Sequence, residues 1–427
     1  MLKVSRDRAE QETPTDVVRH PIPRVGVALF DEARDSGWAK LAGGETFRFR
    51  APQDLASDCI WVCQSEDWVF RDKHRGCSHL RMGDYISKLS YIASDLGFRV
   101  DGSGKFGARA REACEVLAPT IHRAVVIAAQ AYGWSSPAQW LKEDSLMEDI
   151  RKFLGEVVPA TAIKPWLRAP LQAAYQSYSS VATSGRPYGE ASAVVTLRFN
   201  RVEHAQRVMA TPVPEGAWTC TEASADSANL LDHVLSIDRP CLVNATVEFS
   251  AQDAEIAALC AYGSQPKRSV LRAWMSQPEI DWLSKFATIH VQSFWKAEHG
   301  RPVSPKLQLP AALTADPIFQ LSVPVGLVAE AHWRALAKDY YKPSVEGRRE
   351  FSPTAVWLRA ADRALCFRLA LAAHKAGFHV TGYGNGSVTV LCAPDRLPEL
   401  LEFAQQNEVA HPVFQSIFQE FGLIHAS

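Results

Sequence analysis

The sequence has no long hydrophobic run and no secretory signal. Its longest apolar stretches, such as Ala124–Tyr132, are far shorter than the ~20 residues that a membrane-spanning helix needs. Residues 1–24 are polar, contain three prolines and lack the apolar core of a signal peptide. These absences lead us to expect a soluble, cytoplasmic protein without a membrane partner.

The protein also lacks a large net charge of either sign. There are 46 basic and 47 acidic residues, a formal net charge of −1. The total therefore does not indicate a nucleic-acid or membrane-surface binder, although local clusters still can. With 47% hydrophobic and 22% charged residues, the composition excludes disordered, collagen-like and coiled-coil proteins.

Disulfide frameworks and familiar catalytic motifs are absent as well. The nine cysteines are odd in number, and Cys114, Cys260 and Cys366 lie in apolar segments, which favours reduced, buried thiols. No Gly-x-Ser-x-Gly or His-Glu-x-x-His occurs, and Phe106 follows Lys105 where a phosphate loop needs Ser or Thr. We therefore expect no cofactor. We also expect a non-enzymatic protein rather than an enzyme.

The length of 427 residues predicts two or three domains at ~100–200 residues each. The pattern indicates a multidomain α+β protein with a helical N-terminal half, a strand–helix middle region and a ferredoxin-like C-terminal sandwich. A turn-rich break at Thr183–Pro187 and a later proline-rich connector set the boundaries. The expected parts are a flexible segment 1–24, a mixed then mainly helical domain 25–182, a middle domain 188–345 and a ferredoxin-like domain 346–427.

Short strands and then helices are predicted in the first part. Thr46–Arg50 and Ile60–Val62 are strand-like, whereas a helix is expected from Asp84 to Gly97. A further helix is expected at Ile121–Tyr132, within a region to Tyr178 that is mainly helical.

Two strand–helix units are predicted in the middle part. Ala193–Phe199 precedes a helix at Val202–Met209, and Ala245–Phe249 precedes one at Ala251–Tyr262. The two units are alike, and each strand ends in a polar residue suited to cap the next helix, Asn200 and Ser250. This likeness reflects either a duplicated element or the common appearance of any strand, cap and helix. Helices are also expected at Pro278–Glu298 and Val328–Tyr340.

The sequence pattern of the C-terminal part predicts the element order β-α-β-β-α, which is most of a split-βαβ sandwich. Its elements are a strand at Thr354–Leu358, a helix capped by Asp362 and closed by Gly377, strands at Phe378–Tyr383 and Ser387–Cys392, and a helix from Asp395. Asn385-Gly386 between the two strands is typical of a hairpin turn.

A zinc site is a weaker hypothesis for Cys59, Cys63, Cys77 and His79, with His74 nearby. If Ile60–Val62 is a strand, Cys59 and Cys63 lie ~13 Å apart and cannot share one ion. Whether a metal binds is left open at this point.

Local clusters of basic residues indicate a nucleic-acid surface, because cations contact phosphates while aromatic side chains stack on bases. Trp68, Phe70, Tyr85 and Tyr91 lie among the basic residues of the first cluster, and Asp72, Asp84, Asp95 and Asp101 could instead neutralise it. The candidate binding residues are Arg71, Lys73, Arg75, Arg81, Lys105, Arg109 and Arg111, with Lys342, Arg348 and Arg349 in a second cluster. The second cluster is alternatively an ordinary loop between domains, which is the interpretation that we favour for it. Trp357 and Tyr383 are candidate stacking residues on the C-terminal sheet.

One run resembles a known family. Leu96-Gly97-Phe98, Asp101-Gly102, Phe106-Gly107 and Ala113 stand where the three-helix peptidoglycan-binding module of cell-wall hydrolases has its helix end, turn and next helix. Ala110 replaces the usual Thr, and Cys114–Leu117 lacks the closing Phe-Gln. The resemblance spans about residues 84–117 and implies a helix–turn–helix, with cell-wall binding as a further expectation.

The sequence thus favours a binding or assembly subunit that contacts nucleic acid, alone or with other protein subunits, through its basic N-terminal region. The alternative is a phage- or cell-wall-associated protein with a peptidoglycan-binding-like module. A third hypothesis is an enzyme of unfamiliar type that uses Cys77 and His79 or another pair that no known motif marks.

Overall fold

The computed structural model divides into two compact units, an N-terminal unit (Met1–Ser90 and Arg99–Leu146) and a C-terminal unit (Tyr91–Phe98 and Met147–Ser427). The residues that the structure describes are 24–31, 35–63, 77, 79–82, 93, 109–132, 164–176, 178–181, 193–222, 230–250, 254–260, 270–303, 329–330, 333–334, 336–337, 340–341, 349–350, 352–407 and 409. None of the helices in these ranges is long and apolar enough to cross a membrane.

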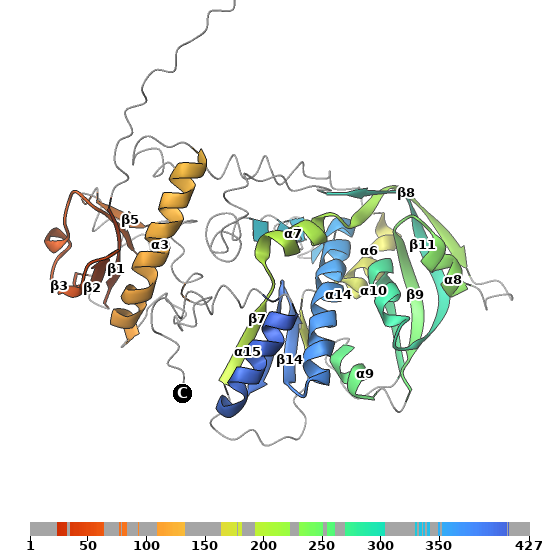
Figure 1. The fold of residues 1–427 in the computed structure, drawn as a ribbon. Helices are drawn as coiled ribbons and strands as arrows, with labels where there is room; N and C mark the ends of the chain where they lie inside the picture. The colour runs from red at the N-terminus through yellow and green to blue at the C-terminus, as the bar shows by residue number, and fades with distance from the viewer. Residues whose placement is uncertain are drawn as a thin grey trace, which may run out of the picture. The chain divides into compact units, whose positions relative to one another are not determined.

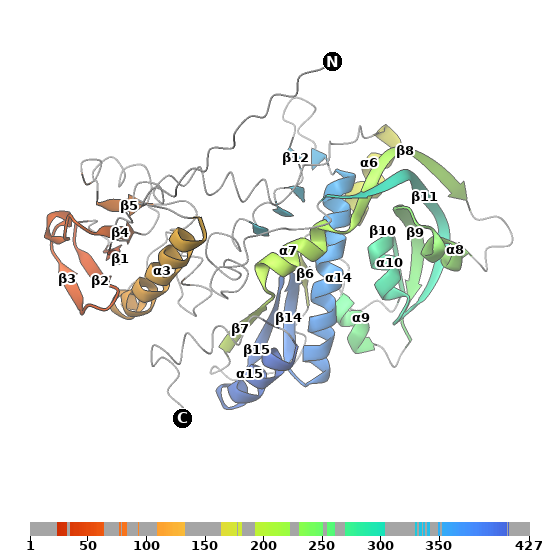
Figure 2. The same ribbon diagram turned by 45° about the horizontal axis from the view of Figure 1, so that its top comes forward.

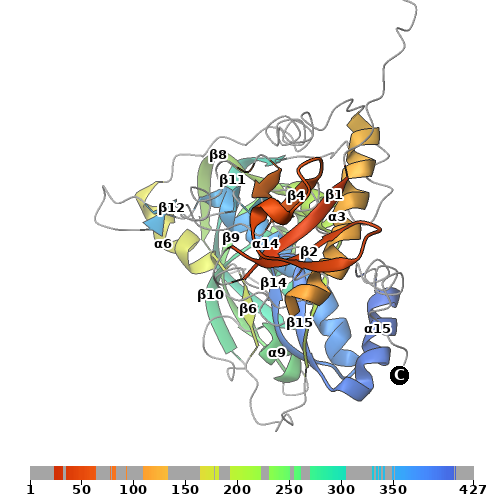
Figure 3. The same ribbon diagram turned by 90° about the vertical axis from the view of Figure 1, so that its left-hand side faces the viewer.

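The N-terminal unit is a five-stranded sheet with one long helix against it (Figure 3). The strand order is β3-β2-β1-β4-β5, antiparallel on the β3 side of β1 and parallel on the other. Its elements are β1 (Val25–Phe30), β2 (Gly37–Leu41), β3 (Thr46–Phe49), η1 (Pro52–Asp54), β4 (Ile60–Cys63), β5 (Leu80–Met82) and α3 (Ala110–Tyr132). All six residues of β1 are buried, as expected for a central strand that is covered on both faces.

The C-terminal unit contains two four-stranded antiparallel sheets with α14 between them (Figures 1 and 2). The strand orders are β10-β9-β11-β8 and β6-β14-β15-β7. The strands are β6 (Ser179–Ser180), β7 (Ala193–Arg198), β8 (Pro212–Glu222), β9 (Cys241–Glu248), β10 (Val270–Ser276), β11 (Thr288–Pro302), β14 (His379–Gly384) and β15 (Ser387–Cys392), with a separate pair β12 (Tyr340–Tyr341) and β13 (Arg349–Glu350). The helices are α6 (Pro165–Ala174), α7 (Arg201–Met209), α8 (Leu230–Ser236), α9 (Ala254–Cys260), α10 (Gln277–Leu283), α14 (Pro353–Lys375), η5 (Pro394–Arg396) and α15 (Leu397–Gln406).

Helix α14 is buried on almost all sides. Ser352 caps its first turn by accepting from the amide of Ala355 at 3.0 Å, and Pro353 occupies the first position, where its missing N–H costs nothing. A helix enclosed in this way has no polar face. Its buried polar residues Arg359, Asp362 and Arg363 therefore need partners from neighbouring elements.

Several predicted elements are confirmed. Strands β3 and β4 match the predicted pieces, and α3 joins the expected helical region around Ala113 to the predicted Ile121–Tyr132 helix. Both strand–helix units exist as β7–α7 and β9–α9, although their strands lie in different sheets. The hairpin turn is confirmed by positive φ angles of 56° at Asn385 and 70° at Gly386.

Two element predictions are wrong. Thr354–Leu358 belongs to α14 and not to a strand, so the ferredoxin-like order loses its first strand, and Asp362 lies inside the helix instead of capping it. The segment Pro278–Glu298 was expected to be one helix, but it contains most of α10 and the first part of β11.

The predicted domain boundary near residue 345 falls between β7 and β15, although these two strands pair in one sheet. The mixture of helices and antiparallel sheets agrees with the α+β class.

Candidate functional site

Most of the predicted basic interface lies outside the described residues. This holds for Arg71, Lys73, Arg75, Lys105, Lys342 and Arg348, while Arg81 and Arg349 are placed only as members of β5 and β13. Arg109 pairs with Glu112 at 2.9 Å, and Arg111 lies 3.6 Å from Glu115 and over the ring of Trp38. These two arginines are exposed but already have acidic neighbours, and the shared cationic surface stays a prediction.

The residues of the zinc hypothesis are partly described by the structure. Cys59 donates to Asp58, Cys63 to the carbonyl of Trp61, and His79 contacts the carbonyl of Pro52 at 3.1 Å. The structure thus gives these three side chains separate partners. The peptidoglycan-type turn at residues 96–107 lies outside the described residues and stays a prediction.

The proposed stacking role of Trp357 and Tyr383 is wrong. Trp357 belongs to α14, and both rings are buried, with 1% and 0% of their surface exposed. Buried rings cannot stack on a ligand without unfolding part of the core.

Asp362 forms the centre of a buried polar site at the tip of the β14–β15 hairpin. Its carboxylate accepts from the amides of Asn385 at 2.7 Å and Gly386 at 2.8 Å, and from His204 Nε2 at 2.8 Å. The left-handed conformation of Asn385 and Gly386 is typical of a tight hairpin turn. Burial raises the pKa of the Asp362 carboxyl, but the hydrogen bonds from His204, Gly386 and Asn385 outweigh it and hold the pKa below its ordinary value.

His204, Asp362 and Cys366 form a group of potential metal ligands within 4.8 Å of one another, all of them buried. The donor set does not fit a metal well. Both carboxylate oxygens of Asp362 already accept from backbone amides, and His204 Nε2 faces the same carboxylate. Burial raises the pKa of the Cys366 thiol well above its ordinary value, whereas metals bind the thiolate. We interpret the group as a hydrogen-bonded support for the hairpin.

A cluster of guanidinium groups adjoins this support. Glu330, with 12% of its side chain exposed, pairs with Arg201, with Arg334 at 2.9 Å and with Arg198 at 3.8 Å. Burial raises the pKa of Glu330, but Arg201 and Arg198 outweigh it and keep the pKa below its ordinary value. The carboxylate stays ionised, and three cations surround one anion.

Arg359 extends the cluster to the hairpin tip. It donates to the side chain of Asn385 at 2.6 Å and to the carbonyl of Ala337 at 3.2 Å, and it lies over the ring of Trp333. We call Arg198, Arg201, Arg334 and Arg359 the arginine group. Trp333 also contacts the ring of His204 at 5.8 Å, so the arginine group and the Asp362 support are continuous.

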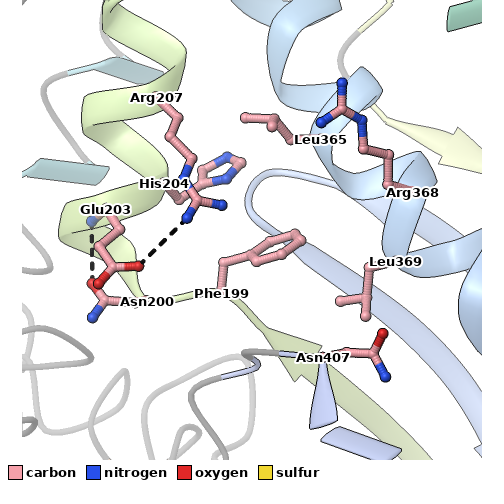
Figure 4. Close-up of a pocket in the computed structure, with 9 residues that line it drawn as sticks. All are labelled: Phe199, Asn200, Glu203, His204, Arg207, Leu365, Arg368, Leu369 and Asn407. Atoms are coloured by element: carbon pink, nitrogen blue, oxygen red, sulfur yellow. Dashed lines mark hydrogen bonds and ion pairs between the residues drawn. The ribbon is translucent and has the colours of Figure 1, made fainter.

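A cavity of about 190 Å³ opens on the other side of His204 (Figure 4). Its lining comes from α7 and the two residues before it, from α14 and from the C-terminal cap of α15. The lining residues are Phe199, Asn200, Glu203, His204, Arg207, Leu365, Arg368, Leu369 and Asn407. As predicted from the sequence, the helix opens on a polar cap, because Asn200 Oδ1 accepts from the amides of Val202 and Glu203 at 3.0 and 3.1 Å.

Sequence reasoning did not single out any member of the arginine group. Arg198 and Arg201 flank a strand end and a helix cap, but Arg334 and Arg359 follow more than a hundred residues later. The only local signal was the pair of arginines around Phe199-Asn200, which is too common a pattern to indicate a site.

No protein-family model matches the sequence, and no curated protein resembles it closely enough to count as a relative. Among solved structures, Phi29 DNA polymerase complexed with primer-template DNA and incoming nucleotide has a TM-score of 0.37 and 14% identity, over 71% of this chain and 59% of that chain. The orthorhombic form of that polymerase gives 0.38 and 14%, over 74% and 60%. The binary complex gives 0.36 and 12%, over 86% and 80%. The chain spans about three fifths of the polymerase in the first two, and a likeness this distant carries no argument about what this chain does.

Proposed function

We propose that the protein binds nucleic acid through the arginine group at the tip of the β14–β15 hairpin. The observation that carries this proposal is the gathering of four guanidinium groups, from β7, α7, the segment around Trp333 and α14. Arg198, Arg201 and Arg334 share Glu330 as their one common carboxylate among the described residues, and Arg359 adjoins them through the ring of Trp333. Each guanidinium offers a planar fork of donors that matches phosphate oxygens.

The cluster is held in place before any ligand arrives. Arg201 is almost fully buried, and Arg359 is fixed by Ala337, Asn385 and the ring of Trp333. Arg334 has 43% and Arg198 21% of its side chain exposed, so both can reach a phosphate from a fixed base. Rigid donors lose little freedom on binding, which favours affinity.

The role we propose is binding, without a chemical step. The adjoining Asp362 carboxylate accepts from the two hairpin amides, and His204 Nε2 bonds to that carboxylate. A polymer with regularly spaced phosphates suits a group of separated cations better than a single small anion does.

Replacing Arg198 and Arg334 together with glutamine should weaken binding of a fluorescent single-stranded oligonucleotide at least about tenfold, because two charge-assisted contacts are lost. The slope of log affinity against log salt should fall by ~1.4, at ~0.7 per phosphate contact. Fluorescence anisotropy over a salt series measures both quantities.

A matched control replaces the exposed Arg239 and Arg272, which lie before β9 and on β10. Arg239→Gln with Arg272→Gln removes the same charge and should leave affinity nearly unchanged. Binding that is absent in the wild type, or lowered equally by both double variants, would show that the arginine group is not the interface.

A further inference from the structure

We propose that the cavity beside Phe199 receives one base of the bound strand, with the neighbouring phosphates on Arg207 and Arg368. This inference rests on the proposed nucleic-acid binding and adds a subsite for one base to it. Three observations support it: a fixed aromatic face, a cationic rim and the size of the cavity.

The aromatic face is provided by Phe199. Its ring stacks on the ring of His204, with centroids 5.4 Å apart and planes 10° apart, and it also lines the cavity. His204 is held in turn by Asp362. A ring supported in this way is already oriented for stacking, and such stacking tolerates any base because every base has a π face.

The walls and rim come from two helices. Leu365 and Leu369 project from α14 toward the ring, as Figure 4 shows. Arg207 of α7 lies 3.9 Å from Glu203, and Arg368 of α14 is exposed and makes no hydrogen bond or ion pair with another residue that the structure describes. Two guanidiniums thus stand at the cavity beside one carboxylate.

The size points to part of a polymer. A volume of about 190 Å³ is small beside the ~300–1,000 Å³ of pockets that enclose a whole small molecule. It suits one flat ring whose sugar and phosphates stay outside. Helix α7 carries Arg207 at the cavity and Arg201, which pairs with the same Glu330 as Arg198 and Arg334. One helix thus links the cavity to the exposed members of the arginine group.

The test compares an ordinary single strand with an abasic strand of the same length, which keeps the sugar–phosphate backbone but has no bases. Wild-type protein should bind the ordinary strand about 5- to 150-fold more tightly, the range of one stacked base. Phe199→Leu keeps an apolar side chain against His204 and should bring the ordinary strand down to the affinity of the abasic strand. Affinity for the abasic strand should not change.

Phe286→Leu is the matched control, because Phe286 is also a half-buried ring at the edge of the core, packed on Phe367. It should leave both affinities unchanged, and thermal unfolding should show that both variants fold. Phe199→Leu weakening both strands equally would overturn the subsite, since the residue would then act only through structure.

Equal wild-type affinity for the two strands would also overturn the subsite while the proposed function stood. Absence of salt-dependent binding to either strand would overturn the proposed function and the subsite together. Displacement of the strand by a polyglutamate peptide in wild type but not in Phe199→Leu would assign the cavity to an acidic protein partner. It would overturn the proposal that the cavity receives a base.

Discussion

Arg363→Leu should destabilise the C-terminal unit by about 3–5 kcal/mol, as expected when one partner of a buried ion pair is removed. Arg363 of α14 pairs with Glu279 of α10, and the two side chains have 1% and 0% of their surface exposed. The other described partner of Glu279 is Ser276, whose amide and hydroxyl donate at 3.2 and 3.3 Å. Without the guanidinium, the carboxylate stays in the core with no counter-ion. Urea unfolding followed by tryptophan fluorescence measures the loss.

Two controls separate the charge from the loss of packing. Arg363→Leu combined with Glu279→Leu removes both charges and should recover much of the stability, because apolar replacements of a whole buried pair are often neutral or better. Lys285→Met breaks an exposed pair with Asp281 at 3.5 Å and should cost under ~0.5 kcal/mol. A cost below ~1 kcal/mol for Arg363→Leu alone would contradict the expectation.

Local rules of backbone conformation were the most reliable guide from sequence to fold. Asn385-Gly386 could be assigned to a hairpin because few residue pairs adopt positive φ without strain, and the angles agree. Asn200 could be assigned as a helix cap for a similarly local reason.

Apolar runs were ambiguous wherever burial on two sides removed the periodic signal. Thr354–Leu358 fits a buried strand as well as a buried helix, and only packing between two sheets makes it the start of α14. In Pro278–Glu298 the turn at residues 284–287 contains neither glycine nor proline, so nothing in the sequence marked where α10 ends and β11 begins.

The candidate site could not be predicted because its residues meet only in the folded chain. Arg334 meets Arg198 and Arg201 through their shared partner Glu330. Arg359 comes from α14, which lies beside α7 and the hairpin (Figure 2), and it contacts Asn385 at the hairpin tip. The sequence instead favoured runs of neighbouring cations such as those near Arg109 and Arg111. In the structure these two arginines lie one helical turn from glutamates, the spacing that neutralises charge on a helix surface.

Asp362→Asn should destabilise the C-terminal unit by about 2–3 kcal/mol at neutral pH, because bonds to an ionised acceptor are stronger than bonds to an amide oxygen. The asparagine amide would also direct donors at the N–H groups of Asn385 or Gly386, or at His204 Nε2, which now bond to the two carboxylate oxygens. Asp281→Asn, at an exposed carboxylate on α10, should change stability by under ~0.5 kcal/mol.

The loss in Asp362→Asn should also depend on pH in a defined direction. Folding lowers the pKa of Asp362 below its ordinary value of 3.8, so its contribution to the free energy of unfolding is fully present above that value. It is lost as the pH falls through the lower, folded-state pKa. Urea unfolding of wild type and variant at neutral pH and at progressively lower pH should therefore show two stabilities that converge in acid. A difference that stayed constant or grew below pH 3.8 would mean that Asp362 does not hold the hairpin as a carboxylate.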